Sequence, residues 1–236
     1  MLDLIYKDIV QNRKLILLYA LLGGFVGLVM MAAGSDGGGI FAAYIMISTY
    51  GFAIRSTYDE DKSSAYLFLK SLPLSDGAIV TSKFASVLTV SVLLIIFFNV
   101  TAVLGAYLAS SGIIPGLGSA VATPRTFDFA AFLGEVAPSF AMVFSMAVVV
   151  TGAYLVMFFW AGFAKASTYS RAILLAIFVL VMLGAGVAGR SPLVRNLART
   201  IETSSWVPAM SVIIGLAVYW ACCGASILKV RAKDWS

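Results

Sequence analysis

The stretch of this chain that most resembles a chemical site is a glycine-rich motif near its carboxyl end. Gly184, Gly186 and Gly189 match the GxGxxG pattern, and with Ser191 they approach a phosphate-binding P-loop in which Arg190 replaces the lysine. Such loops need a preceding strand and a following helix, whereas this motif ends an apolar run of membrane-spanning length. Glycines also let transmembrane helices approach closely. We therefore interpret the motif as helix packing and do not expect the chain itself to bind or hydrolyse ATP.

The other reactive side chains predict no catalytic, cofactor or metal site. The sequence contains no histidine, which excludes Ser–His–Asp triads and histidine metal ligands. Cys222 and Cys223 are adjacent within an apolar run, a spacing that suits neither a disulfide framework nor a zinc site. The apolar runs lack the charged residues of proton- or ion-coupled transporters. Asn99 and Thr101 are their most polar residues, and we interpret them as interhelical hydrogen-bonding groups rather than substrate contacts.

The composition is that of an integral membrane protein. Of the 236 residues, 61% are hydrophobic and 11% charged, against about half and about a quarter in soluble domains. Runs of about 20 apolar residues can cross the hydrocarbon core as helices. Six such runs predict an all-α membrane protein with a single transmembrane domain, residues 1–236, and six spans: Leu15–Gly34, Gly38–Ile54, Ala85–Ala109, Val136–Trp160, Arg171–Gly189 and Val207–Leu228.

The positive charges indicate how these spans are oriented. Twelve of the 16 Lys and Arg residues fall in the N-terminal arm, in 55–84, in 161–171 and in the C-terminal tail. The positive-inside rule then places both termini in the cytoplasm. We expect a multi-pass protein of the plasma (inner) membrane of a bacterium. The net charge of +5 follows from this topology, so we expect no nucleic-acid partner.

Two further segments have amphipathic patterns. Residues 1–14 place apolar side chains at helical spacing between charged ones, which predicts a helix in the membrane interface. Residues 190–206 carry Leu193, Leu197 and Ile201 at four-residue spacing. This segment is either a short amphipathic helix at the outer surface or an ordinary interfacial loop.

The segment 55–84 is the largest predicted cytoplasmic loop. Three acidic residues precede Ser63 and Ser64, which could cap a short helix that continues to about Lys70 and ends before Pro73. That helix would expose more apolar surface than a free cytoplasmic helix should. It either docks on a cytoplasmic partner or lies on the bilayer.

Three motifs in this sequence resemble a known family. They are an LxxKD-like stretch at Leu4–Asp8, YDED at Tyr58–Asp61, and SLPLSDGAIVTSKF at Ser71–Phe84. Together with the predicted topology, they resemble the six-span permeases of type-2 ABC exporters, nearest to the branch that includes the phenol-soluble modulin exporter permease. In that family the loop after the second span is the coupling helix, and short re-entrant helices lie between the last two spans. The small SSA sequence at 63–65 departs from the bulkier residues expected there.

The resemblance implies a role for the 55–84 segment and for the chain. The segment would couple the permease to a separate ATPase subunit, which would bind the ATP and Mg²⁺. Two permease copies would pair above two ATPase chains and export an amphipathic or lipophilic cargo. A peptide toxin or antimicrobial peptide is the first expectation, and a lipid or drug the second. The alternatives are a non-transporting sensor or assembly protein that docks a partner through 55–84, and, less favoured by the residues, an intramembrane enzyme. The implied coupling residues are Asp59, Glu60, Asp61, Tyr66, Leu67 and Leu69.

Overall fold

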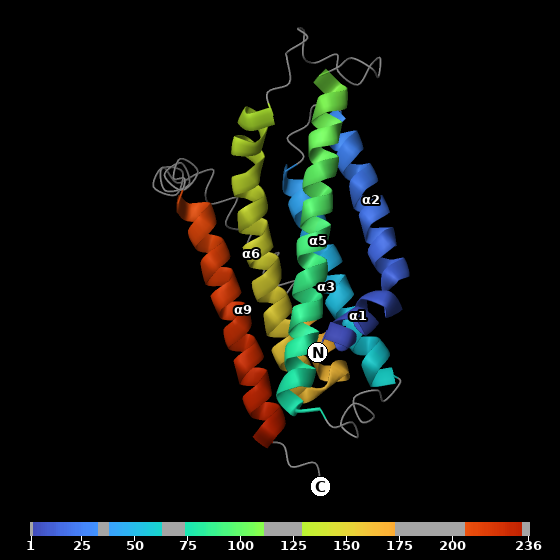
Figure 1. Cartoon of the computed structure of the whole chain (residues 1–236), viewed down its shortest axis with the longest axis vertical. Coiled ribbons are helices and arrows are strands. Elements are labelled where there is room, and N and C mark those ends of the chain that lie inside the picture. The colour runs from blue at the N-terminus through green and yellow to red at the C-terminus, as the bar shows by residue number, and fades with distance from the viewer. Residues whose placement is uncertain (1, 33–37, 63–73, 111–128, 173–205, 233–236) are drawn as a thin grey trace.

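The computed structural model describes residues 2–32, 38–62, 74–110, 129–172 and 206–232. All secondary structure in these ranges is helical. Figure 1 shows α2, α3, α5, α6 and α9 running along the long axis of a bundle, with α1 at one end. The helices are α1 (Leu2–Gln11), α2 (Arg13–Ala32), α3 (Gly38–Lys62), α5 (Asp76–Ser110), α6 (Phe129–Ala161) and α9 (Trp206–Ala232), and residues 163–172 are helical as well.

Several helices have the length and apolar character of membrane spans. Asp76–Leu108, Phe140–Ala161 and Trp206–Ala232 qualify individually, and α1 with α2 qualifies as one pair bent by 63°. A membrane-integral protein is therefore supported. The predicted second span lies within α3, and the predicted fifth span, Arg171–Gly189, falls almost wholly outside the described residues. The count of six spans stays a prediction, as does the helix or loop at 190–206, which also lies outside them.

The ends of the predicted 55–84 loop are helical. Residues 55–62 continue α3, and residues 76–84 form the first turns of α5. The apolar run of the second span stops at Ile54, but the helix does not, because charged side chains can extend a helix when they are paired. Arg55 Nε lies 3.3 Å from Asp59 Oδ2, one turn further along α3.

Asn12 separates α1 from α2. Its carbonyl oxygen accepts hydrogen bonds from the amides of Leu15 and Ile16, as expected for the residue that begins α2. Its side-chain Nδ2 donates to the carbonyl oxygen of Asp8, 3.0 Å away, and so bonds the last turn of α1. The two helices are thereby joined at a fixed bend rather than by a free linker.

Tight helix contacts define the core. α6 packs along α9, and α2 packs along α5. A Cβ atom on Gly215 of α9 would lie 3.0 Å from Cα of Ser145 on α6, so only glycine permits this approach. Tyr219 OH donates a hydrogen bond to the carbonyl oxygen of Phe84, 2.7 Å away, and links α9 to α5.

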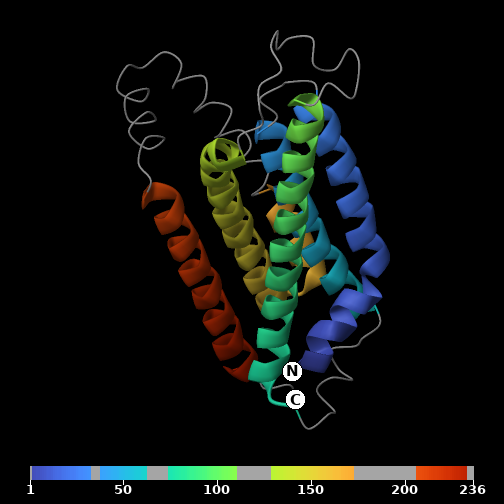
Figure 2. The same cartoon turned by 45° about the horizontal axis from the view of Figure 1, so that its top comes forward.

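The described segments that we assign to the cytoplasm lie near one end of the bundle. The start of α1, the end of α3, the start of α5 and the end of α9 lie near the same end in both views (Figures 1 and 2). Gly162, with φ of 82°, turns the chain between α6 and the helical residues 163–172 at this end. The chain regions assigned to the cytoplasm from charge are therefore gathered together.

Candidate functional site: a buried charge cluster

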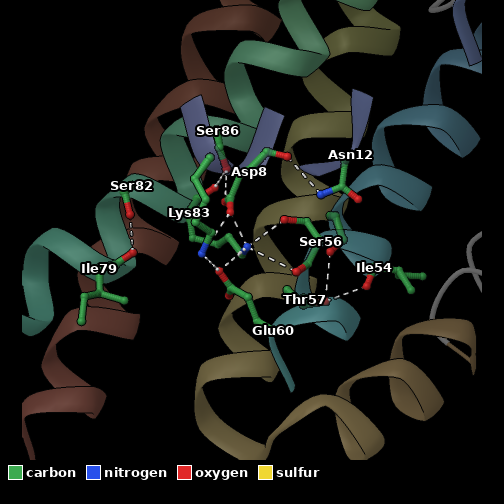
Figure 3. Close-up of polar contacts among 12 residues, drawn as sticks. Asp8, Asn12, Ile54, Ser56, Thr57, Glu60, Ile79, Ser82, Lys83 and Ser86 are labelled. Carbon is green, nitrogen blue, oxygen red and sulfur yellow. Dashed lines mark hydrogen bonds and ion pairs between the residues drawn. The ribbon is translucent and has the colours of Figure 1, made fainter. Parts of the chain in front are cut away.

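Lys83, in the second turn of α5, is the centre of a buried charge cluster (Figure 3). Only 3% of its side chain is exposed. Its Nζ lies 3.0 Å from Oδ2 of Asp8 on α1 and 2.8 Å from Oε1 of Glu60 on α3. The same ammonium donates to Oγ of Ser56, 2.7 Å away. One side chain therefore joins three helices.

Further groups complete the pairing of these charges. Ser86 Oγ donates to Oδ2 of Asp8 at 3.0 Å. Lys7 Nζ lies 3.6 Å from Glu60 Oε1 and 3.8 Å from Asp8 Oδ1, and its side chain is 38% exposed. Two carboxylates thus face two ammonium groups, one buried and one at the edge. Buried charges are tolerated when they are paired and hydrogen-bonded in this way.

Helical spacing explains how each helix presents its groups. Ser56 and Glu60 are four residues apart on α3, and Lys83 and Ser86 are three apart on α5. Residues with these spacings lie on the same face of a helix. Asp8 is the buried residue of α1, whose opposite face is exposed. The three faces meet to enclose the cluster.

A cavity of about 10 Å³ adjoins the cluster, about the space that one water molecule needs. It has no room for a larger ligand. The two serine hydroxyls of the cluster, of Ser56 and Ser86, are buried and bonded to Lys83 and Asp8, and the described residues hold no group of three or more His, Cys, Asp or Glu placed to bind a metal. Its chemistry is that of a link between helices. The cavity is lined by Leu4, Lys7, Asp8, Glu60, Ile79, Ser82, Lys83 and Phe159.

The structure describes three of the six predicted coupling residues, and their surroundings differ. Glu60 is buried in the cluster, Asp59 pairs with Arg55 at the surface, and Asp61 is exposed. All three lie in the last turn of α3, where Asp59 pairs with Arg55 and Glu60 pairs with Lys83 and Lys7. The predicted cap at Ser63 and Ser64 and the helix to Lys70 lie outside the described residues and stay a prediction. Tyr66, Leu67 and Leu69 lie outside the described residues.

Sequence reasoning missed that Glu60 pairs with Lys83 and that Lys83 also pairs with Asp8. Lys83 counted only as a positive charge in a cytoplasmic loop, and Asp8 only as a polar residue of an interfacial helix. The signal that could have found them is the position of the three motifs. Leu4–Asp8 supplies Asp8, Tyr58–Asp61 supplies Glu60, and Ser71–Phe84 supplies Lys83. The three motifs form one site.

A second polar network lies between α3, α6 and residues 163–172. Thr57 Oγ1 and Tyr154 OH are 2.5 Å apart. Tyr50 OH donates to Oγ of Ser170, and the rings of Tyr50 and Tyr154 pack edge to face with centroids 5.5 Å apart. This network joins the other side of α3 to α6 and to the turn that follows it.

Asn99 and Thr101 do not make the predicted interhelical bonds among the described residues. Asn99 Nδ2 donates to the carbonyl oxygen of Ile95, and Thr101 Oγ1 to that of Phe98, both within α5. Such bonds to a preceding turn satisfy a polar side chain without a partner helix. Asn99 also lines an open groove of about 290 Å³ between α5 and α6, otherwise walled by apolar side chains such as Ile96 and Phe144.

Comparison with known proteins identifies the family. Residues 3–230 match the sequence model of the family described as ABC-2 family transporter protein. The search of curated proteins gives no match. The family match spans nearly the whole chain and includes all three charged residues of the buried cluster. On that evidence, and with its apolar membrane-length helices, the chain belongs to the ABC-2 transporter family.

Proposed function

We propose that this protein is the permease subunit of an ATP-driven exporter. The observation that carries the proposal is the family match over residues 3–230, because ABC-2 permeases work with an ATPase partner. The chain would bind ATP and Mg²⁺ only through that partner. Two copies of the permease would pair, with two ATPase subunits beneath them in the cytoplasm.

The proposed arrangement has six spans in a bacterial inner membrane with both termini inside. Five of the six apolar runs lie mostly within described helices. The distribution of Lys and Arg supports the orientation, since the described parts of the four basic segments lie near the same end of the bundle: the start of α1, the end of α3 with the start of α5, residues 163–172, and the end of α9 (Figures 1 and 2). Residues 1–14 would lie in the inner interface beside the ATPase.

Residues 63–73 are the proposed contact with the ATPase. The segment is bounded by α3, which ends at Lys62, and by α5, which begins at Asp76. Its apolar residues Tyr66, Leu67 and Leu69 would enter a groove on the partner, and the carboxylates of Asp59 and Asp61 would border the contact.

The proposed cargo is amphipathic or lipophilic. Residues 84–110 of α5, 140–161 of α6 and 206–228 of α9 contain no Asp, Glu, Lys or Arg. A path along these helices offers apolar surface and no fixed charge, which suits an amphipathic or lipophilic cargo. The order of candidates, a peptide toxin or antimicrobial peptide first and a lipid or drug second, comes from the resemblance to the exporter permeases.

Purification of the chain from its native membranes in a gentle detergent, followed by mass analysis, tests this function. We expect an ATPase subunit at equal stoichiometry. Leu67→Asp should release it, since a charge cannot enter an apolar groove without losing its hydration. Leu67→Met is the matched control, because it changes the same side chain without adding a charge. A chain that is dimeric but reproducibly without an ATPase would contradict the proposal and favour a sensor or assembly protein.

A further inference from the structure

We propose that Asp8, Glu60 and Lys83 form a clamp that makes α1 and the adjoining ends of α3 and α5 move as one body. This rests on the proposed function, in which residues 63–73 receive the movement of the ATPase. Lys83 is then a positioning residue of the transport cycle, although it does not itself contact the ATPase or the cargo.

The position of the cluster along the chain supports this role. Residues 63–75 connect α3 to α5. Along each of these two helices, the cluster lies between this connection and the uncharged part of the helix. Glu60 lies two residues before the end of α3, and Lys83 lies in the second turn of α5. A force on the connecting segment therefore reaches the Glu60–Lys83 pair first. The 2.8 Å contact between them prevents the two helix ends from separating.

Asp8 extends the clamp to α1. Its carboxylate accepts from Lys83 Nζ and from Ser86 Oγ, both at 3.0 Å and both on α5. The outer face of α1 is exposed at Leu2 and Tyr6, so the charged contact lies on the one face that meets the bundle. α1 is thus held to the start of α5 and, through Lys83, to the end of α3.

Burial makes the clamp rigid. Separation of α5 from α1 and α3 would withdraw Lys83, the one buried ammonium of the cluster, which lies within 3.0 Å of the carboxylates of both Asp8 and Glu60. The surface pair of Arg55 and Asp59 differs in this respect, since its arginine is 54% exposed and water replaces the contact easily. Of these two charged contacts, the buried cluster is therefore the one that restrains relative movement.

The test measures distances between spin labels in the permease–ATPase complex, reconstituted in lipid nanodiscs. One label pair, at Gln11 of α1 and Thr89 of α5, reports on the clamp, and both positions are exposed and outside the cluster. The other pair, at Tyr107 of α5 and Trp206 of α9, reports on the opposite end of the bundle, where both side chains are exposed. Cys222 and Cys223 are replaced by alanine, and labelled copies are diluted with unlabelled ones so that each complex carries one pair.

In the clamped protein we expect MgATP with vanadate to shift the Tyr107–Trp206 distance while the Gln11–Thr89 distance stays constant. The triple variant Asp8→Asn, Glu60→Gln, Lys83→Met removes the clamp without leaving a buried charge. In this variant we expect the distribution of Gln11–Thr89 distances to broaden by at least about 1–2 Å, the size of a typical helix shift. We also expect the nucleotide-dependent change in the Tyr107–Trp206 distance to be lost. Arg55→Gln with Asp59→Asn should behave as the unaltered chain, and Lys83→Arg should retain most of the response.

Two results would overturn the clamp while leaving the permease assignment intact. One is a Gln11–Thr89 distance that changes with nucleotide in the unaltered chain, which needs no cluster variant. The other is a triple variant with normal behaviour of both pairs. Absence of an ATPase from the purified complex, or no response of either pair to nucleotide, contradicts both the clamp and the proposed function.

Discussion

Replacing Lys83 by methionine should destabilise the protein strongly, because it removes the charge that two buried carboxylates share. Asp8 Oδ2 and Glu60 Oε1 both lie within 3.0 Å of the lysine Nζ, so they are at most about 6 Å apart. At an effective dielectric constant of about 20, two like charges at that distance repel by about 3 kcal/mol. Breaking a buried ion pair by removing one partner costs about 3–5 kcal/mol in general. Lys7 offsets part of this repulsion, since it lies 3.6 Å from Glu60 and 3.8 Å from Asp8, but its 38% exposed side chain is screened by solvent.

We therefore expect Lys83→Met to lower the free energy of unfolding by about 3–5 kcal/mol. The assay is equilibrium unfolding in mixed micelles at increasing SDS mole fraction, followed by the fluorescence of the four tryptophans. Methionine retains the length and most of the volume of lysine, so the change tests charge rather than packing.

The triple variant with Asp8→Asn and Glu60→Gln added to Lys83→Met is the matched comparison. It contains no unpaired buried carboxylate, so we expect it to recover more than half of the lost stability, as neutral replacements of buried ion pairs do. If Lys83→Met unfolds within about 1 kcal/mol of the unaltered chain, or if the triple variant is no more stable than Lys83→Met, the electrostatic reasoning is wrong.

Two further changes test helix packing by the same unfolding assay. Gly215→Ala should cost about 1–3 kcal/mol, since its Cβ would press on Ser145, whereas Gly224→Ala on the same helix, with nothing within 4 Å, should be neutral or stabilising. Tyr154→Phe should cost about 0.5–1.5 kcal/mol, because it removes a buried hydroxyl 2.5 Å from a threonine on α3. Tyr169→Phe, at a tyrosine that is 59% exposed, should change stability by less than about 0.5 kcal/mol. Equal effects within either pair would contradict the packing described here.

The sequence predicts the helices well because apolar runs report a local property. Residues of α5, α6 and α9 are apolar for the length that a membrane requires, and no distant contact is needed to see it. The ends of the helices are another matter. Ile54 ends an apolar run, but α3 continues to Lys62 through residues that pair with each other and with α1 and α5. The end of the apolar run marks where the surroundings change from apolar to polar, and the helix continues past that point.

The buried cluster could not be predicted in the same way. Asp8, Glu60 and Lys83 are far apart in the chain, and each is flanked by residues that explain it locally. Counting Lys83 among cytoplasmic charges uses only the sign of the charge and its side of the membrane. Whether water or a carboxylate solvates that charge depends on how three helices meet, which no short window of sequence contains. The same limit applies to Asn99, whose hydrogen bond within its own helix is as compatible with the sequence as a bond to a neighbour.

In the proposed permease, the cluster gives a physical reason why three separate short motifs occur together in the chain. A permease in which a partner's movement enters between α3 and α5 needs those helix ends fixed to each other, and it needs α1 fixed to them if that helix is to follow. One ammonium group can bind two carboxylates at once, so three charged residues on three helices suffice. An apolar contact of the same size would hold the helices without fixing their register, since dispersion forces are weakly directional. The buried ion pairs at 2.8 and 3.0 Å restrict the register of the three helices, which gives Asp8, Glu60 and Lys83 a structural role in a chain of which only 11% is charged.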